Sequence, residues 1–145
     1  MIQRIQTIYF VLAAITFGVL FLVPFATSSE PIPNLLQDQV YNIMDSPVLI
    51  GLTAIGILVS LVGIFLYGNR SVQARLGYFT IISGILLPLV AILLIYNEGT
   101  VTTKASLIKD GFGIYLPILA LIFGILAVRN INKDEKLVQS MDRLR

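Results

Sequence analysis

Four long apolar stretches without a charged side chain constrain this chain more than any other feature of its sequence. They cover residues 5–25, 48–67, 76–96 and 112–128, and every Asp, Glu, Lys and Arg lies outside them. The hydrocarbon core of a bilayer is about 30 Å thick, so a helix needs about 20 apolar residues to cross it. We therefore expect an all-α membrane protein with four spans.

The composition leaves room for a single membrane domain. The chain has 145 residues, of which 57% are hydrophobic and 12% are charged, whereas soluble domains carry about 25% charged residues. Four spans use more than half of this length, so we predict one domain over residues 1–145 with a tail from 129 to 145. The short connection between the second and third spans favours an up-down-up-down four-helix transmembrane bundle.

Lys and Arg concentrate on one side of the predicted spans. Eight lie in the N-terminal segment, the connection between the second and third spans, and the tail, whereas only Lys104 and Lys109 lie in the other connections. Basic residues in short loops stay in the cytoplasm during insertion. We therefore expect both termini in the cytoplasm.

A cleaved signal peptide is the alternative interpretation of the first stretch. Arg4 precedes it, and Ala26, Thr27 and Ser28 are typical of a small-residue cleavage site. However, the apolar run is longer than the roughly 7–15 residues usual in signal peptides. We expect the first stretch to persist as a helix.

The two outer connections carry mixed signals. Apolar residues from Leu35 to Met44 recur at loosely helical spacing, which predicts a short helix on the membrane surface. The alternative is a strand over 39–43 that pairs with 101–107, because Thr100–Thr103 is rich in β-branched residues. Either way we expect some local structure there.

The tail is predicted to continue the fourth span as an amphipathic helix. Its apolar stripe comprises Ile131, Leu137, Val138, Met141 and Leu144. At about 100° per residue, one flank of that helix collects its basic side chains. These are Arg129, Lys133, Lys136 and Arg143. The helix either rests on lipid headgroups or docks a cytoplasmic partner.

Small residues form one stripe on each span, as close helix packing in lipid requires. The stripes are Ala14 and Gly18; Gly56, Ser60 and Gly63; Gly77, Thr80 and Gly84; and Ala120, Gly124 and Ala127. Pro88 and Pro117 lie inside the third and fourth spans and are expected to bend them. Hydroxyl side chains within the spans are expected to bond backbone carbonyls one turn back.

The residue types needed for most catalysis and ion transport are missing. The chain has no Cys and no His, which excludes disulfides, thiol nucleophiles and His-held haem. No ionisable residue lies within a span, where such residues mark transport pathways. No phosphate loop or metal-ligand spacing is present. We therefore predict a non-enzymatic protein with no catalytic, cofactor-binding or metal-binding residues and no affinity for nucleic acid.

Three segments on the cytoplasmic side resemble a known family. They are the opening Met1–Thr7, the connection around Asn69–Leu76, and the ending from Lys133 to Arg145. Together they look like the bacterial domain of unknown function 4293. The resemblance implies a small four-span protein of the bacterial inner membrane and implies no activity.

These motifs suggest a polar interaction cluster at the mouth of the bundle. Its predicted members are Arg4, Arg70, Arg75, Asp134, Glu135, Asp142 and Arg143. The competing interpretation is an ordinary basic flank with loosely placed acids, since an exposed ion pair contributes only about 0–1 kcal/mol.

Three functions can be weighed. The first is a non-enzymatic accessory or scaffold subunit that uses its cytoplasmic face, with the lipid bilayer and a membrane or cytoplasmic protein as partners. The second is a small transporter or channel for a neutral or lipid-like solute. It would need a cavity near Thr53, Ser83, Pro88 and Pro117. An enzyme would need outer-loop residues to converge. The candidates are Glu30, Asp38, Asp45 and Lys104.

Overall fold

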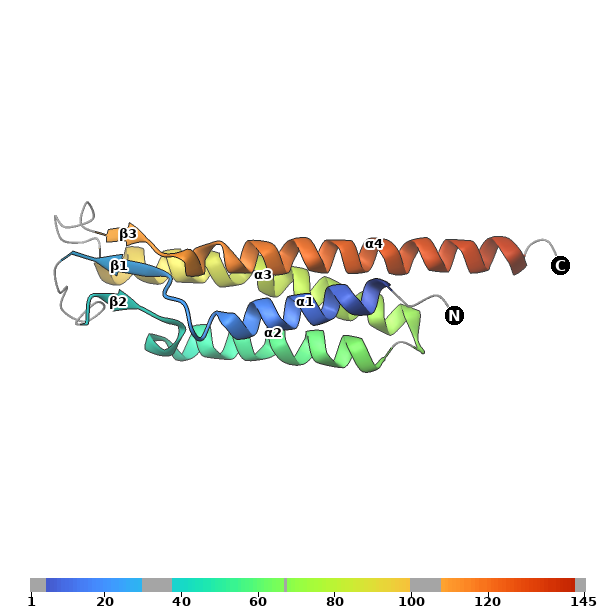
Figure 1. The fold of residues 1–145 in the computed structure, drawn as a ribbon, viewed down its shortest axis with the longest axis horizontal. Coiled ribbons are helices and arrows are strands. Elements are labelled where there is room, and N and C mark those ends of the chain that lie inside the picture. Colours follow the sequence, from blue (N-terminus) through green and yellow to red (C-terminus); the bar gives the residue numbers. More distant parts are fainter. Residues whose placement is uncertain (1–4, 30–37, 67, 100–107, 143–145) are drawn as a thin grey trace.

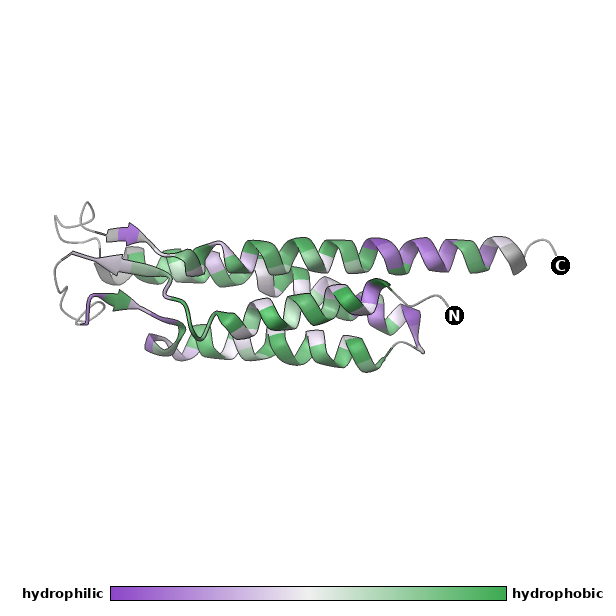
Figure 2. Ribbon diagram, viewed as in Figure 1, coloured by the Kyte–Doolittle hydropathy of each residue, from purple (hydrophilic) through white to green (hydrophobic). Residues whose placement is uncertain are grey.

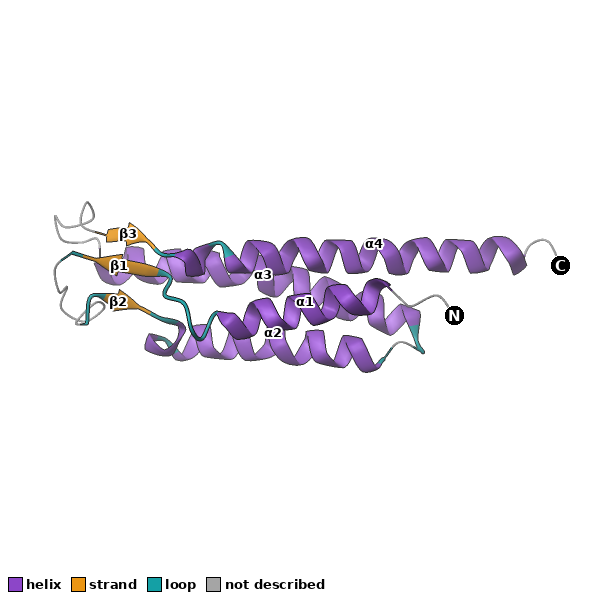
Figure 3. Cartoon of the chain, viewed as in Figure 1, coloured by secondary structure: helices purple, strands orange, loops and turns teal. Residues whose placement is uncertain are grey.

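The computed structural model describes residues 5–29, 38–66, 68–99 and 108–142. Four helices make up most of it: α1 (Ile5–Val19), α2 (Pro47–Phe65), α3 (Arg70–Gly99) and α4 (Leu116–Asp142). Three short strands and two 3₁₀ turns complete it: β1 (Ala26–Ser28), β2 (Val40–Tyr41), β3 (Ile108–Asp110), η1 (Ile43–Asp45) and η3 (Phe112–Ile114) (Figure 3). The expectation of a mostly helical protein with four helices is confirmed.

The helices pack in a ring in chain order. α1 contacts α2 and α4, and α3 contacts the same two helices from the other side. Successive helices alternate in direction, so the start of α1 and the end of α4 lie at one end and the strands at the other (Figure 1). We call these the basic end, which carries Arg70, Arg75 and α4 from Arg129 onward, and the sheet end.

Three helical segments are long and apolar enough to cross a membrane: Pro47–Phe65, Arg70–Ile95 and Phe112–Ser140. The first stretch differs from the prediction, because α1 ends at Val19 and not at Phe25. Bonds from Phe21 N to Gly18 O and from Leu22 N to Val19 O tighten its last turn. Pro24 disfavours helix in the residue before it. The chain therefore does not resume the helix after Val19 and enters β1 at Ala26.

Small residues on α2 form holes that aromatic side chains of α1 fill. A Cβ on Gly56 would lie 3.1 Å from the ring of Phe17, and a Cβ on Gly63 would lie 2.8 Å from the ring of Phe10. The predicted stripes on the second, third and fourth spans are buried. The predicted stripe on α1 is wrong: Gly18 has no atom within 4 Å of such a Cβ. The face of α1 that packs against α2 carries phenylalanines, because the small residues that make room for them lie on α2.

Four hydroxyls within the helices bond backbone carbonyls one turn back, as expected: those of Thr16, Thr53, Ser60 and Thr80. Thr53 Oγ1 donates to Leu49 O at 2.8 Å, and Ser60 Oγ donates to Gly56 O at 2.8 Å. Ser60 Oγ also lies 3.5 Å from Thr80 Oγ1, which joins α2 to α3. Hydroxyls satisfied within the helix can enter the apolar interior at little cost.

The strands form an antiparallel sheet in the order β2-β1-β3. Ala26 pairs with Tyr41 on one side and Asp110 on the other. The strand alternative is confirmed at Val40–Tyr41, but its partner is β1; the predicted partner 101–107 lies outside the described residues. The surface helix is wrong over 38–42, where β2 leads into η1, and residues 30–37 lie outside the description.

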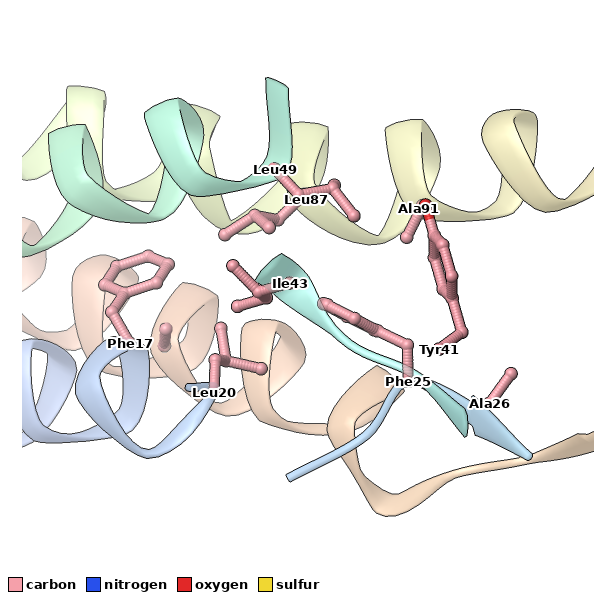
Figure 4. Close-up of a cluster of buried hydrophobic side chains, with 10 residues drawn as sticks. Phe17, Leu20, Phe25, Ala26, Tyr41, Ile43, Leu49, Leu87 and Ala91 are labelled. Atoms are coloured by element: carbon pink, nitrogen blue, oxygen red, sulfur yellow. The ribbon is translucent and has the colours of Figure 1, made fainter. Parts of the chain in front are cut away.

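A hydrophobic cluster lies between the sheet and the helices (Figure 4). Phe25 and Tyr41 enter it from the strand region, Phe17 from α1, and Leu49 and Leu87 from α2 and α3. All five are buried. The cluster explains why the residues after α1 leave the helix: extended backbone delivers Phe25 beneath the sheet.

The two internal prolines have different positions. Pro88 lies inside α3, as predicted. Pro117 is the second residue of α4, because the apolar stretch from Phe112 begins with η3 and not with α-helix. The prediction that Pro117 lies inside the helix of the fourth span and bends it is therefore wrong. Proline is tolerated in a first turn, where its missing N–H would have no partner in the helix.

Candidate functional site at the basic end

α4 continues without a break from its apolar half into its charged half, as the prediction for the tail required (Figure 2). The apolar stripe predicted for the tail lies in two different environments. Ile131 is fully buried with Phe10 and Ala127 in a second hydrophobic cluster, whereas Leu137 is 56% exposed. The tail is thus anchored in the bundle at Ile131 and presents Leu137 to the outside about one and two-thirds turns later.

The structure brings together only part of the predicted cluster. Arg70 and Glu135 line one groove of about 490 Å³, with Gly68, Asn69, Val138 and Gln139 as its other walls. Arg75 is exposed on α3, and it lines neither this groove nor the two others described at this end. Among the side chains that the structure describes, Arg70 and Arg75 form no ion pair with Asp134 or Glu135.

The remaining cluster members cannot be placed. Arg4 and Arg143 lie outside the described residues, and of Asp142 only the backbone, at the end of α4, is described. What the structure shows of the predicted cluster is therefore one groove, at which α4 lies against the connection between α2 and α3. The four described charges of the cluster form no ion pair with one another.

A buried pair of glutamines ties three helices together near this end. Gln6 Nε2 donates to Gln73 Oε1 at 3.0 Å, and Gln73 Nε2 donates to the backbone oxygen of Gly63 at 2.9 Å. Gln6 is 1% exposed and Gln73 is 0% exposed. Within the described part of the chain, Gln6 Oε1 has no hydrogen-bond partner. The pair links α1, α3 and α2 through side chains that cannot reach water.

Both glutamines lie in segments that carry the family resemblance, Met1–Thr7 and Asn69–Leu76. A further signal was available: Gln6, Phe10, Ala13 and Phe17 follow the i, i+4, i+7, i+11 spacing of one helix face. All four are buried in α1. An amide on an otherwise apolar face requires a buried polar partner.

Replacing Gln73 with Leu should destabilise the fold by about 1–3 kcal/mol, because it leaves the whole Gln6 amide buried without a partner. Thermal unfolding in a mild detergent measures the effect. The double variant Gln6→Leu, Gln73→Leu should be more stable than the single one, since it removes the orphaned amide. Gln139→Leu, at an exposed position, is the matched control. A double variant less stable than Gln73→Leu would contradict the role of the pair.

A second groove, of about 580 Å³, runs between α3 and α4. Tyr78 and Ile81 of α3 face one side of α4 there. That side carries three cations of the predicted basic flank, Arg129, Lys133 and Lys136. The sequence predicted the flank but not the helix that lies against it.

Two further sets of residues bear on the enzyme and transporter interpretations. Asp38 and Asp45 are exposed, and Asp45 accepts a hydrogen bond from the backbone of Asn42 at 2.6 Å. Glu30 and Lys104 lie outside the described residues. No group of three or more acidic side chains suited to a metal occurs in the described ranges. The two grooves at the basic end are not lined by Thr53, Ser83, Pro88 or Pro117.

Comparison with known families decides the assignment. The model of a domain of unknown function, DUF4293, matches residues 2–144. The chain belongs to the DUF4293 family. This confirms the resemblance carried by the three motif segments. No curated protein and no solved structure matches the chain. For this DUF4293 protein, the two grooves and the glutamine pair are the features from which a role can be argued.

Proposed function

We propose that this DUF4293 protein crosses the bacterial inner membrane four times. The observation that supports it is the distribution of side chains in the helices. The buried residues of α2 are Leu49, Thr53, Gly56, Ser60 and Gly63, whereas its large apolar side chains face outward, with Leu58 60% exposed. A soluble monomer rarely exposes so continuous an apolar surface, and small or hydroxyl residues between helices are typical of membrane packing.

The first crossing uses α1 together with the chain that follows it. Fifteen residues of α-helix span about 22 Å, less than the hydrocarbon core. Residues 20–28 complete the distance in non-helical form. Irregular backbone is tolerated at membrane depth where protein covers it. Leu20, Phe25 and Ala26 are buried, and Phe25 N donates to Tyr41 O at 2.8 Å.

The basic end faces the cytoplasm in this proposal. Arg70 and Arg75 begin α3, and Arg129, Lys133 and Lys136 follow the apolar half of α4. Of the charged side chains described at the sheet end, Lys109 is basic and Asp38 and Asp45 are acidic. The positive-inside bias places the richer side in the cytoplasm.

Within the membrane we propose a non-enzymatic accessory subunit that docks a partner through the second half of α4. This segment projects beyond the other three helices (Figure 1). The 14 residues from Arg129 to Asp142 extend over about 20 Å. Leu137 is exposed among charged and amide side chains, which is the composition of a helix that packs on another surface.

Affinity purification in mild detergent from native membranes tests the docking role. Full-length protein should retain a partner that is lost when the chain is truncated after Asn132. This truncation keeps Ile131, whose burial with Phe10 would otherwise be lost. Leu137→Glu should weaken retention at least several-fold, whereas Met44→Glu, at a residue 64% exposed at the sheet end, should not. Equal retention by full-length and truncated protein, or no partner with either, would reject the docking role.

A further inference from the structure

The groove between α3 and α4 combines an apolar half with a basic half. Ile81, Ile125 and Val128 line the apolar half. Val128 is held there because it packs on Gly77, where a Cβ would collide with its side chain. Ile125 is 46% exposed, so this half is an open furrow on the surface that faces lipid in the proposed orientation.

The basic half lies toward the end of α4. Arg129, Lys133 and Lys136 are exposed there, and seven residues of helix separate the outer two by about 10 Å along the axis. Asn132 lies between them, and no acidic residue lines the groove. Glu135 lines the adjoining hollow with Asn132 and Lys136, and Asp134 lines none of the three grooves.

We propose that this groove binds one anionic phospholipid of the cytoplasmic leaflet. The phosphate lies against Arg129, Lys133 and Lys136, and an acyl chain follows Ile81 and Ile125. Tyr78, 51% exposed, lies at the boundary, the depth at which aromatic side chains anchor in membranes. The proposal rests on the membrane insertion and orientation argued above, and not on the docking role of α4.

The order of apolar and basic side chains along the groove favours this ligand. A free phosphate would use the cations but leave the apolar half empty, and a neutral solute would not need the cations. A lipid with a negative headgroup satisfies both halves at once, in the order in which a bilayer presents them. Basic pockets between helices on the cytoplasmic side are suited to such headgroups, and a guanidinium can bind a phosphate through two hydrogen bonds.

Native mass spectrometry of the full-length protein in neutral detergent tests the proposal with added phosphatidylglycerol and phosphatidylcholine. Phosphatidylglycerol should bind at least about tenfold more tightly. The double variant Lys133→Gln, Lys136→Gln should lose most of this preference. The double variant Arg70→Gln, Arg75→Gln removes the same charge from the same end but outside this groove, and should keep it. Equal binding of both lipids, or equal effects of the two double variants, would overturn the proposal.

A second pair of variants tests the apolar half with the charge unchanged. Ile125→Trp fills the groove and should weaken phosphatidylglycerol binding several-fold. Ile122→Trp, on the same helix at a residue 44% exposed and outside the groove, should not. Inorganic phosphate at millimolar concentration should leave the lipid bound. If phosphate displaces the lipid and Ile125→Trp has no effect, the site binds free anions and the proposal fails.

A separate experiment distinguishes a groove that does not bind lipid from a membrane topology other than the one proposed. Because the chain has no cysteine, a single Lys136→Cys or Asn42→Cys variant reports the side of the membrane through an impermeant thiol reagent applied to intact cells. Labelling of Asn42→Cys alone supports the orientation whatever the lipid experiment shows. Labelling of Lys136→Cys alone would overturn both the orientation and the cytoplasmic-leaflet lipid.

Discussion

Replacing Gly111 with Ala should be among the most destabilising single changes in this protein. A Cβ at Gly111 would collide with the backbone oxygen of Pro24 and lie 2.8 Å and 2.9 Å from the backbone carbon and oxygen of Phe25. Backbone atoms cannot rotate away as a flexible side chain can. The approach is also held by hydrogen bonds, from Gly111 N to Phe25 O at 2.8 Å and from Gly113 N to Pro24 O at 2.9 Å.

The expected cost is at least about 2–3 kcal/mol, the upper part of the range for overpacked sites. The change would separate the chain entering α4 from the chain entering β1 and so disturb the sheet and the cluster beneath it. Thermal unfolding in detergent should show a clear fall in Tm. Gly68→Ala is the matched control, because a Cβ there meets no atom within 4 Å. Similar Tm values for the two variants would show that this contact is not close in solution.

Replacing Gly84 with Leu should force α3 and α4 apart. A Cβ at Gly84 would lie 3.0 Å from Cβ of Leu121 and 3.1 Å from both Leu121 N and Pro117 O. Even this first atom meets backbone, and the three further carbons of leucine have less room. The better helix propensity of leucine, worth about 0.8 kcal/mol over glycine, does not compensate for this.

We expect a net loss of about 2 kcal/mol or more, because overpacking of close helices generally costs 1–3 kcal/mol or more. Gly51→Leu on α2 is the control: a Cβ there meets no atom within 4 Å, so this variant should be as stable as the wild type or more stable. Unfolding of both variants in the same detergent measures the difference. A stable Gly84→Leu variant would mean that α3 and α4 do not pack through this glycine.

The helices were predictable because hydropathy and charge are local properties of the chain. The apolar stretch at 48–67 corresponds to α2, Pro47–Phe65, within two residues at its end. The tail was predictable as a helix because Ile131, Leu137 and Val138 repeat at helical spacing, and α4 runs through all three. The small-residue stripes on α2, α3 and α4 were predictable for the same reason.

The end of α1 was not predictable from hydropathy. Residues 20–25 are as apolar as the helix before them, but Phe25 is buried beneath the sheet and not on a helix face. Hydropathy reports that a side chain leaves water and does not report whether its backbone is helical or extended. Pro24 is a local signal against helix in the residue before it. The role of β1 as the central strand depends on partners that follow Ala26 by 15 residues in β2 and by 84 residues in β3.

The candidate sites likewise have a part that the sequence predicts and a part that depends on the tertiary structure. The sequence alone determined the four apolar stretches, the family, and the basic flank of α4 that carries Arg129, Lys133 and Lys136, since each is a property of composition or of one helix's periodicity. Only the tertiary structure decided that Tyr78 and Ile81 lie against this flank, that Gln6 meets Gln73, and that Arg70 shares a groove with Glu135. These contacts join residues 48 or more positions apart. Which helix faces meet depends on how whole helices rotate about their axes and cross one another. That arrangement is set where phenylalanines of α1 pack on glycines of α2. No single segment of the sequence encodes this fit.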